Sequence, residues 1–138
     1  MIVVDTNVIA SLVLPTSKHT KLAMRLLEKH RDWASPTLWR SEFCNILATG
    51  VKNRWFGADQ AFEALATAED VMEGGEYTVP ASEVVKTAVE SGCTAYDSEF
   101  VVLARDFSVP LVTLDSAILK AFPTIATSLH EFSSKGAS

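Results

Sequence analysis

Short runs rich in β-branched residues alternate along this chain with longer stretches that have helical periodicity. This alternation is typical of βα units, in which helices connect the strands of a parallel sheet, so the sequence predicts an α/β fold. Ser35 and Pro36 suit the N-cap and first position of the second helix. The expected strands are residues 2–5, 32–35, 77–79, 110–114 and 124–127, and the expected helices are residues 17–31, 36–54, 58–73, 81–91, 97–107 and 116–122.

The sequence indicates one domain followed by a short tail. A chain of 138 residues buries most of the surface that it exposes when unfolded, so it needs no disulfide or metal for stability alone. No long linker, internal repeat or low-complexity segment interrupts the alternation. We therefore expect a single domain over residues 1–132 and a flexible C-terminal tail over residues 133–138, which read SSKGAS.

The charge balance excludes one class of nucleic-acid-binding protein. The formal net charge is -5 and the isoelectric point is about 5.1, which argues against a protein that coats nucleic acid through bulk positive charge. An acidic site remains compatible with phosphate chemistry, because a divalent cation reverses the local charge. Composition alone therefore leaves a metal-dependent activity on phosphate open.

The N-terminus and the cysteines indicate the compartment. The apolar stretch from residue 2 to residue 14 is interrupted by Asp5 and Asn7, is too short to span a bilayer and lacks the features of a signal peptide. Cys44 and Cys93 show no paired framework or CxxC spacing and are interpreted as reduced thiols. We expect a soluble, cytoplasmic protein that does not contact membranes.

Three aspartates occupy the ends of predicted elements. Asp5 ends the first strand, Asp115 follows the fourth strand, and Asp97 begins the helix DSEFVVLARDF. In open parallel sheets ligands bind beyond the carboxyl ends of the strands, which makes Asp5 and Asp115 candidates for a site. Taken singly, each aspartate is better explained as a helix cap that complements the helix dipole.

Glu42 lies in the middle of a predicted helix, where capping is not an explanation. Its neighbours four residues away are Leu38 and Ile46, so no basic residue is spaced to pair with it, while Asn45 lies on the same face. A carboxylate on a mostly apolar stripe is unfavourable unless another group satisfies it. Glu42 is therefore a functional carboxylate, a buried group bonded to the backbone or a distant base, or an exposed edge of the stripe.

The four carboxylates together point to a cation site. They occur in the order strand end, helix interior, helix start and strand end. Hard divalent cations such as Mg²⁺ take oxygen ligands, usually one or two protein carboxylates with waters and substrate phosphate. Clustered carboxylates would otherwise raise each other's pKa, and a cation keeps them ionised together.

This ordered combination resembles the PIN-domain ribonucleases, and within them the VapC-like toxins of bacterial toxin–antitoxin pairs. The similarity lies in VVDTNVIASLV at the start, in SEFCNIL around Glu42 and Asn45, and in TAYDSEFVVLARDFSVPLVTLD from Thr94 to Asp115. It extends through essentially the whole chain. The resemblance implies a PIN-like fold, with a small central parallel sheet flanked by helices on both faces and with the first and fourth strands as neighbours.

The resemblance also implies a role for each matching side chain. Asp5 and Asp97 would bind Mg²⁺ directly, with Mn²⁺ as a substitute. Glu42 and Asp115 would act through ordered water or a second ion. These four acids together would form the catalytic quartet. The supporting polar positions are Thr6, Asn7, Asn45 and Thr113.

The implied activity is Mg²⁺-dependent hydrolysis of RNA phosphodiesters by an endoribonuclease. VapC-like toxins pair with a small antitoxin that blocks the site, and they are usually homodimers. The resemblance therefore implies an RNA substrate, a cognate antitoxin and a homodimer. A solitary PIN-domain RNA-processing nuclease is the alternative within the same family.

Proteins of other classes also carry carboxylates at strand ends, but they fit this chain less well. A phospho-accepting receiver domain expects adjacent acids after the first strand and a Lys after the last, and this chain has DTN in the first place and no such Lys in the second. A haloacid-dehalogenase-like phosphatase expects a second Asp where this chain has Asn7. A PIN fold that serves only for binding is disfavoured by the complete quartet.

A basic and aromatic cluster, Lys52, Arg54 and Trp55, stands at the end of the second predicted helix. Such a cluster is able to grip RNA by stacking and by phosphate contacts. The simpler interpretation is structural, because basic residues complement the dipole at a helix C-terminus and Trp55 then packs against a neighbour.

The remaining polar side chains are interpreted as lying outside the site. Glu99 follows Asp97 by two residues, which on a helix points it to nearly the opposite side. The three histidines are scattered in polar surroundings without ligand spacing, and they are expected at the surface: His19, His30 and His130.

Overall fold

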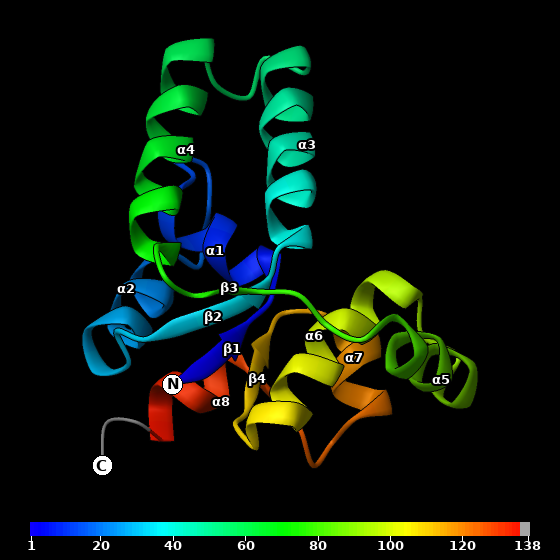
Figure 1. Cartoon of the computed structure of the whole chain (residues 1–138). Coiled ribbons are helices and arrows are strands. Elements are labelled where there is room, and N and C mark those ends of the chain that lie inside the picture. The colour runs from blue at the N-terminus through cyan, green and yellow to red at the C-terminus, as the bar shows by residue number, and fades with distance from the viewer. Residues whose placement is uncertain (136–138) are drawn as a thin grey trace.

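The computed structural model describes residues 1–135, and its centre is a parallel β-sheet (Figure 1). The sheet order is β3-β2-β1-β4-β5, and every neighbouring pair is parallel. The strands are β1 (Ile2–Val4), β2 (Trp33–Pro36), β3 (Glu76–Tyr77), β4 (Leu111–Thr113) and β5 (Ala126–Ser128). The predicted α/β fold is confirmed, and each predicted strand is present with slightly different ends.

Helices make every connection between the strands. In the described part of the chain they are α1 (Thr6–Val13), α2 (Thr20–Lys29), α3 (Leu38–Lys52), α4 (Ala58–Met72), α5 (Ala81–Ser91), α6 (Ala95–Phe107), α7 (Ser116–Ala121) and α8 (Leu129–Lys135). The sequence pattern predicts neither α1 nor α8. Across residues 1–135, none of these helices has the length and apolar character needed to cross a bilayer.

The strand order places helices on both faces of the sheet. The connections through α1 to α4 carry the chain from β1 toward β3, whereas those through α5 to α7 carry it toward β5. Right-handed crossovers put these two groups on opposite faces. In agreement, α6 packs on β1, β2 and β4, and α5 packs on α6. In the other group, α1 packs on β4 and α4 packs on β2. The sheet is thus the middle layer of three.

The core lies along both faces of the central strands. Val3 and Val4 of β1 and Leu111 and Val112 of β4 have no exposed surface. A parallel sheet between two layers of helices is buried on both sides, so its strands carry continuous apolar runs instead of alternating ones. This burial explains why the N-terminal run IVV has no polar residue until the strand ends.

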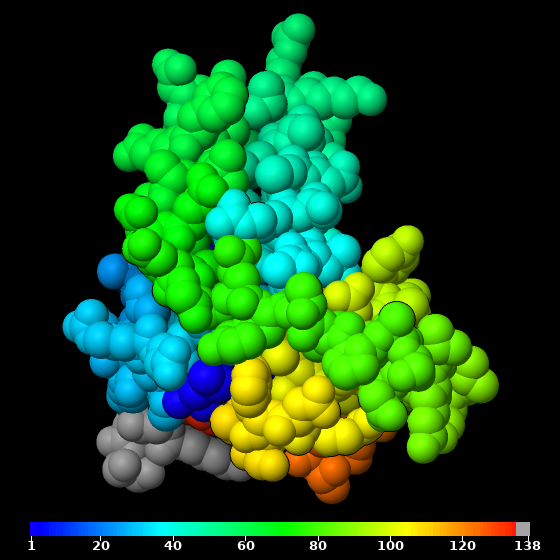
Figure 2. All heavy atoms as spheres, in the orientation of Figure 1, coloured from blue at the N-terminus to red at the C-terminus, as the bar shows by residue number. Residues whose placement is uncertain are grey.

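The helices α3 and α4 form a hairpin that projects from the body of the molecule (Figure 2). Phe43 and Leu47 of α3 and Ala61 and Ala64 of α4 are buried, which holds the two helices together. The loop between them is therefore the far end of the hairpin, on the side away from the sheet (Figure 1).

Residues 6–13 form α1, although the sequence analysis predicts no helix there. The segment TNVIASLV is rich in β-branched residues, which locally favour a strand. It becomes a helix because the Asp5 carboxylate accepts a hydrogen bond from the backbone N–H of Thr6 at the N-terminus and because Val8 and Ile9 are fully buried. Tertiary packing overrides local preference here.

Ser35 and Pro36 do not start α3, contrary to the prediction. Both lie in β2, and the helix begins at Leu38. Pro36 has no N–H to give to the sheet, and the Ser35 hydroxyl donates a hydrogen bond to the carbonyl of Val4 in β1 at 2.6 Å. The serine therefore completes the sheet and does not cap a helix.

The predicted flexible tail does not begin directly after residue 132, because the next three residues are part of a helix. The helix α8 continues to Lys135, and Ser133 is buried, with its hydroxyl donating to the carbonyl of Leu22 in α2 at 3.3 Å. Residues 133–135 are thus helical. The rest of the predicted tail, residues 136–138, lies outside the described residues.

Candidate active site

The strands β1 and β4 are neighbours, but the chain leaves them toward opposite edges of the sheet. Such a reversal opens a crevice beyond the carboxyl ends of the two strands, which is where open α/β sheets bind ligands. Asp5 directly follows β1, and Asp115 comes two residues after β4. The predicted adjacency of the first and fourth strands is confirmed, and it brings both aspartates to this crevice.

Asp5 is a buried carboxylate held at both of its oxygens. Only 7% of the residue is exposed. Its Oδ1 accepts a hydrogen bond from the Thr6 backbone N–H at 2.7 Å, so Asp5 also caps α1. Its Oδ2 accepts from the Thr113 hydroxyl at 2.7 Å and from the Asn7 amide at 3.3 Å. The capping explanation is therefore correct but incomplete, because the second oxygen belongs to a network that reaches another strand.

Thr113 and Asn7 connect this network to the end of β4. The Thr113 hydroxyl accepts a hydrogen bond from the backbone N–H of Asp115 at 3.0 Å while it donates to Asp5. The Asn7 side-chain oxygen accepts from the backbone N–H of Leu114 at 3.2 Å. Asp115 in turn caps α7, since its Oδ1 accepts from Ala117 N–H at 2.8 Å. The ends of β1 and β4 are thus fixed relative to each other by side chains.

Glu42 reaches the same crevice from α3. Its Oε1 accepts a hydrogen bond from the Thr6 hydroxyl at 2.7 Å. Arg40 is the only basic residue of the described chain that forms ion pairs, and its partners are Glu69 and Glu76, so Glu42 has no basic partner. Glu42 is partly buried and its partner is a side-chain hydroxyl, so the interpretations as a group bonded to the backbone or to a base, and as an exposed edge of the stripe, do not fit. Thr6 links it to Asp5 through its side chain and its backbone.

Asp97 is presented by the first turn of α6. This helix begins two residues earlier than predicted, with Thr94 as its N-cap, and the Thr94 hydroxyl accepts from the Asp97 backbone N–H at 3.0 Å. The hydroxyl of Ser98 donates to the Thr94 carbonyl at 2.8 Å and is fully buried. The cap therefore fixes the turn that carries the Asp97 carboxylate, which itself remains partly exposed.

The charges of these carboxylates act on one another. Burial raises the pKa of Asp5 from 3.8 to about 6, and the nearby charges of Glu42 and Asp97 add to that rise. Burial likewise raises the pKa of Glu42, with a contribution from Asp97, and the pKa of Asp97, with a contribution from Asp115. The four predicted acids therefore surround one electronegative crevice.

Glu99 lies closer to this crevice than the sequence analysis predicts. Its pKa is raised first by burial and then by the charge of Glu42. Helical spacing gives the direction of the Glu99 side chain only relative to Asp97, which lies on the same helix. Its approach to Glu42 depends on how α3 and α6 are placed relative to each other, for which the sequence gives no signal.

Asn45 is the one predicted supporting residue that the structure leaves outside the network. It is exposed on α3 one turn after Glu42, and its side chain makes no hydrogen bond to any described residue. The other three predicted supporting residues, Thr6, Asn7 and Thr113, each hydrogen-bond a quartet carboxylate. Asn45 thus faces solvent beside the crevice.

The donor set of the crevice fits a hard divalent cation. Its ligand atoms are oxygens of carboxylates, with the Thr6 and Thr113 hydroxyls beside them. Among residues 1–135, no three acidic, histidine or cysteine side chains converge closely enough to hold an ion by themselves. Mg²⁺ does not require such a cage, because it usually binds through one or two carboxylates and retains several waters. The spacing is therefore compatible with Mg²⁺ or Mn²⁺ and not with a closed structural metal site.

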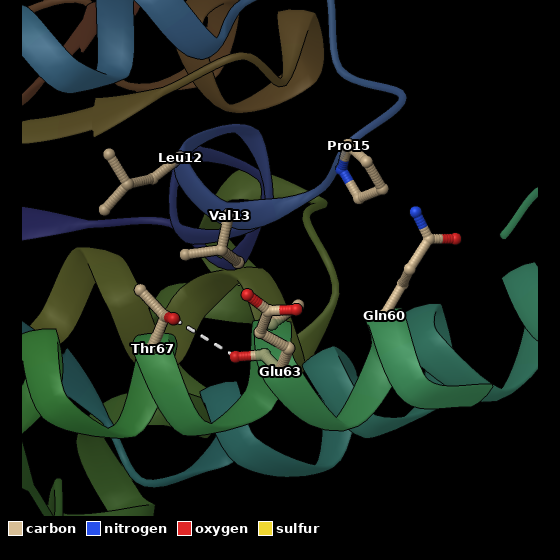
Figure 3. A pocket seen from close by; sticks show the side chains of 7 residues that line it. Leu12, Val13, Pro15, Gln60, Glu63 and Thr67 are labelled. Atoms are coloured by element: carbon tan, nitrogen blue, oxygen red, sulfur yellow. Dashed lines mark hydrogen bonds between the residues drawn. The ribbon is translucent and has the colours of Figure 1, made fainter. Parts of the chain in front are cut away.

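The crevice is distinct from an open hollow elsewhere on the surface. This hollow of about 300 Å³ lies between the end of α1 and the side of α4 (Figure 3). It is lined by Leu12, Val13, Pro15, Gln60, Glu63, Ala64 and Thr67, and it contains none of the four acids. The candidate site is therefore defined by its carboxylates and their hydrogen bonds and not by this hollow.

The hydrogen bond that Thr113 donates to Asp5 leads to a prediction that can be tested without a ligand. Because this bond stabilises the ionised carboxylate, replacing Thr113 with Val should raise the pKa of Asp5 further above about 6. An NMR titration of the side-chain carboxyl groups measures this change. Thr113→Ser keeps the hydroxyl and should leave the pKa near the wild-type value. An unchanged pKa in Thr113→Val would contradict the assigned network.

Comparison with known proteins agrees with the observed fold. The chain is 26% identical over 129 residues to "Ribonuclease VapC3" of Pyrobaculum aerophilum, covering 91% of this chain and 98% of that protein. The crystal structure of PAE2754 from Pyrobaculum aerophilum superposes with a TM-score of 0.74 at 23% identity, covering 98% of this chain and 95% of that one. The model of the PIN domain matches residues 2–122, which is most of the chain. This chain therefore belongs to the PIN-domain family.

Proposed function

We propose that this protein is a Mg²⁺-dependent endoribonuclease, and that it acts in the cytoplasm as the toxin of a VapBC-like toxin–antitoxin pair. The observation that carries the proposal is the crevice at the β1–β4 reversal, where Thr6 and Thr113 join Asp5, Glu42 and Asp115 in one hydrogen-bond network and the charge of Asp97 raises the pKa of Asp5 and Glu42. The similarity to a protein named as a VapC ribonuclease supports the same activity. Membership of the PIN family also removes the receiver and phosphatase alternatives.

Asp5 and Asp97 are the proposed direct ligands of the cation. Asp5 is suited to this role because Thr113, Asn7 and the Thr6 backbone fix both of its oxygens. A divalent cation in such a site supplies charge neutralisation at a phosphate and a lower pKa for an attacking water. Without a counter-charge, burial holds the pKa of Asp5 near neutrality, so cation binding and ionisation of Asp5 are linked.

Glu42 and Asp115 are proposed to orient water at the two sides of the crevice. The Thr6 hydroxyl fixes one oxygen of Glu42, and the N-terminus of α7 fixes one oxygen of Asp115. In each carboxylate the second oxygen is thereby held in a defined position. Hydrogen bonds from the protein to these groups remove the need to reorganise them during the reaction. The chain's contribution to catalysis is therefore positioning, and no carboxylate needs to act as a nucleophile.

The metal requirement is tested by RNA cleavage with and without a chelator. We expect purified protein to cleave single-stranded RNA in Mg²⁺ or Mn²⁺ and to lose that activity in EDTA, because uncompensated carboxylates repel phosphate. Restoring excess Mg²⁺ should restore cleavage, which separates metal removal from denaturation. Cleavage that persists in EDTA would overturn the proposed mechanism.

The proposed biological role includes an antitoxin and a homodimer. The test is expression of this chain alone and together with a small protein encoded immediately upstream. Growth arrest that is relieved by co-expression, together with recovery of both proteins as one complex, is the expected result. RNA cleavage by a chain that does not arrest growth would favour a solitary RNA-processing nuclease.

A further inference from the structure

The tip of the α3–α4 hairpin carries basic and aromatic side chains that the proposed catalytic machinery does not use. We define the hairpin tip as residues 52–57. Lys52, Arg54 and Trp55 are all exposed there, and 61% of the Trp55 surface is accessible. Tryptophan is usually highly buried in a monomer, so exposure at a projecting position marks a candidate contact surface. The structural explanation of this cluster fails for Trp55, which does not pack into a neighbour.

The backbone of the hairpin tip adopts a conformation that its sequence does not favour. The N–H of Trp55 bonds to the Gly50 carbonyl at 2.9 Å and the N–H of Arg54 bonds to the Val51 carbonyl at 3.1 Å, which is the Schellman pattern of a helix end. That pattern places Arg54 in the left-handed region, with a φ of 60°. Glycine is the usual residue at this position, and arginine there is strained. A basic side chain thus occupies a position where glycine would be more stable.

The same loop is held rigidly against α3. Phe56 is buried, and its ring lies so close to Gly50 that a Cβ atom on Gly50 would stand 2.1 Å from it. Gly50 therefore makes room for the ring within the helix. With Phe56 anchored inward, the preceding Trp55 is fixed in an outward position. A rigid, exposed aromatic ring loses little entropy when it binds a flat partner.

A polar stripe on α3 joins the hairpin tip to the acidic crevice. Glu42, Asn45, Thr49 and Lys52 are spaced by three, four and three residues, which places them on one face of the helix. The buried residues Phe43 and Leu47 lie on another face. Lys52 follows Glu42 by ten residues, and at about 1.5 Å per residue the stripe is roughly 15 Å long. This length corresponds to several nucleotides of a single strand.

We propose that the hairpin tip binds a single-stranded segment of the RNA substrate, with a base stacked on Trp55 and with Lys52 and Arg54 on its phosphates. This inference rests on the proposed ribonuclease function. Lys52 and Arg54 make no ion pair with any described residue, in a protein whose net charge is -5. Stacking combined with basic side chains is the usual way in which proteins hold single strands without reading their sequence. The tip then holds the strand while the crevice receives a phosphate further along it.

The test measures binding apart from cleavage. The probe is a fluorescein-labelled single-stranded RNA of about a dozen nucleotides, in EDTA so that it stays intact, and affinity is read from fluorescence anisotropy. Trp55→Ala should weaken binding roughly tenfold or more, because one stacked base is lost. Arg54→Gly should also weaken binding and lower the dependence of log affinity on log salt by roughly 0.7, the contribution of one phosphate contact to a single strand.

Arg54→Gly also separates a binding role from a structural one. Because glycine relieves the left-handed strain, this variant should unfold at the same temperature as wild type or a higher one while it binds RNA more weakly. The matched control is Lys21→Ala with Arg25→Ala, which removes two exposed positive charges from α2. That control should bind RNA as wild type does.

The outcomes distinguish this proposal from failure of the proposed function. Weaker binding in the tip variants, in a protein that proves unable to cleave RNA, would support the tip as a binding site and overturn the nuclease activity. Wild-type affinity in Trp55→Ala and Arg54→Gly, with cleavage intact, would overturn the tip proposal alone. A changed oligomeric state by analytical ultracentrifugation with unchanged RNA affinity would overturn it too, and would assign the tip to contacts between copies of the chain.

Discussion

Replacing Asp5 with Asn should reduce RNA cleavage by more than about 100-fold while leaving the protein folded. Loss of a partner that only supports a metal ligand already costs 10- to 100-fold, and Asp5 is proposed to be a ligand itself. Asn keeps the size of the side chain and one acceptor oxygen for the Thr6 N–H, so the N-cap of α1 is retained. Initial rates of cleavage in Mg²⁺ measure the effect.

The same substitution should increase stability in metal-free buffer at pH 7. In the folded protein the pKa of Asp5 is raised from 3.8 to about 6, so its ionised form is disfavoured by folding. This penalty is fully present above about pH 6, shrinks as the pH falls and disappears below about pH 4. Its upper limit is about 3 kcal/mol, and we expect a gain of about 1–3 kcal/mol because Asn cannot satisfy the Thr113 and Asn7 donors equally well.

Denaturant unfolding of wild type and Asp5→Asn across this pH range tests the sign. The stability advantage of Asp5→Asn should be largest at pH 7 and should decrease by up to about 3 kcal/mol as the pH falls to about 4. Asp32→Asn is the matched control, since Asp32 is exposed beside β2 at the opposite end of the sheet and should affect neither cleavage nor stability. A destabilised Asp5→Asn at pH 7 would contradict the electrostatic description of the crevice.

Replacing Gly75 with Ala should reduce the free energy of unfolding by about 2–4 kcal/mol. A Cβ atom on Gly75 would lie 2.0 Å from the carbonyl oxygen of Trp33, which is backbone of the central sheet. The Gly75 carbonyl also accepts a hydrogen bond from Ser35 N–H at 2.9 Å, so β3 cannot move away from β2 without losing its pairing. Neither the added atom nor the strand has room to adjust.

Gly57→Ala provides the comparison for this effect. Its φ of -85° is ordinary, and the nearest atom to a new Cβ is 4.0 Å away. The expected loss is below about 1 kcal/mol, consistent with a small change at a helix N-cap. Equal destabilisation by the two substitutions, measured by denaturant unfolding, would show that the close approach of Gly75 to Trp33 is not the cause.

The acids of the candidate site are predicted from their combined order, because each aspartate taken singly is also explained as a helix cap. Asp5 and Asp115 interrupt apolar runs at strand ends, and Glu42 lacks a helical partner for its charge. These signals remain informative in the folded protein, because a carboxylate needs solvent, a hydrogen-bond donor or a counter-charge wherever it lies. Glu99 carries no such signal, because its relation to Glu42 exists only between two helices that are distant in sequence.

The errors in the fold share a physical cause. The helix α1 forms from residues with strand preference because packing and the Asp5 cap outweigh that preference. Ser35 and Pro36 have the composition of a helix start, yet the position of β1 makes them part of a strand. In each case several local conformations are compatible with the residues, and contacts from elsewhere in the chain select one.

The α/β class, the approximate strands and the order of the four acids follow from the amino-acid sequence alone, because apolar periodicity and isolated charges are properties of neighbouring residues. The folded structure was needed to show that Thr6 and Thr113 join three of those acids into one network, that Asn45 stays outside it and that Trp55 projects from a rigid tip. These features depend on distances between segments far apart along the chain. Such distances are set by the packing of the whole domain, which no local pattern encodes.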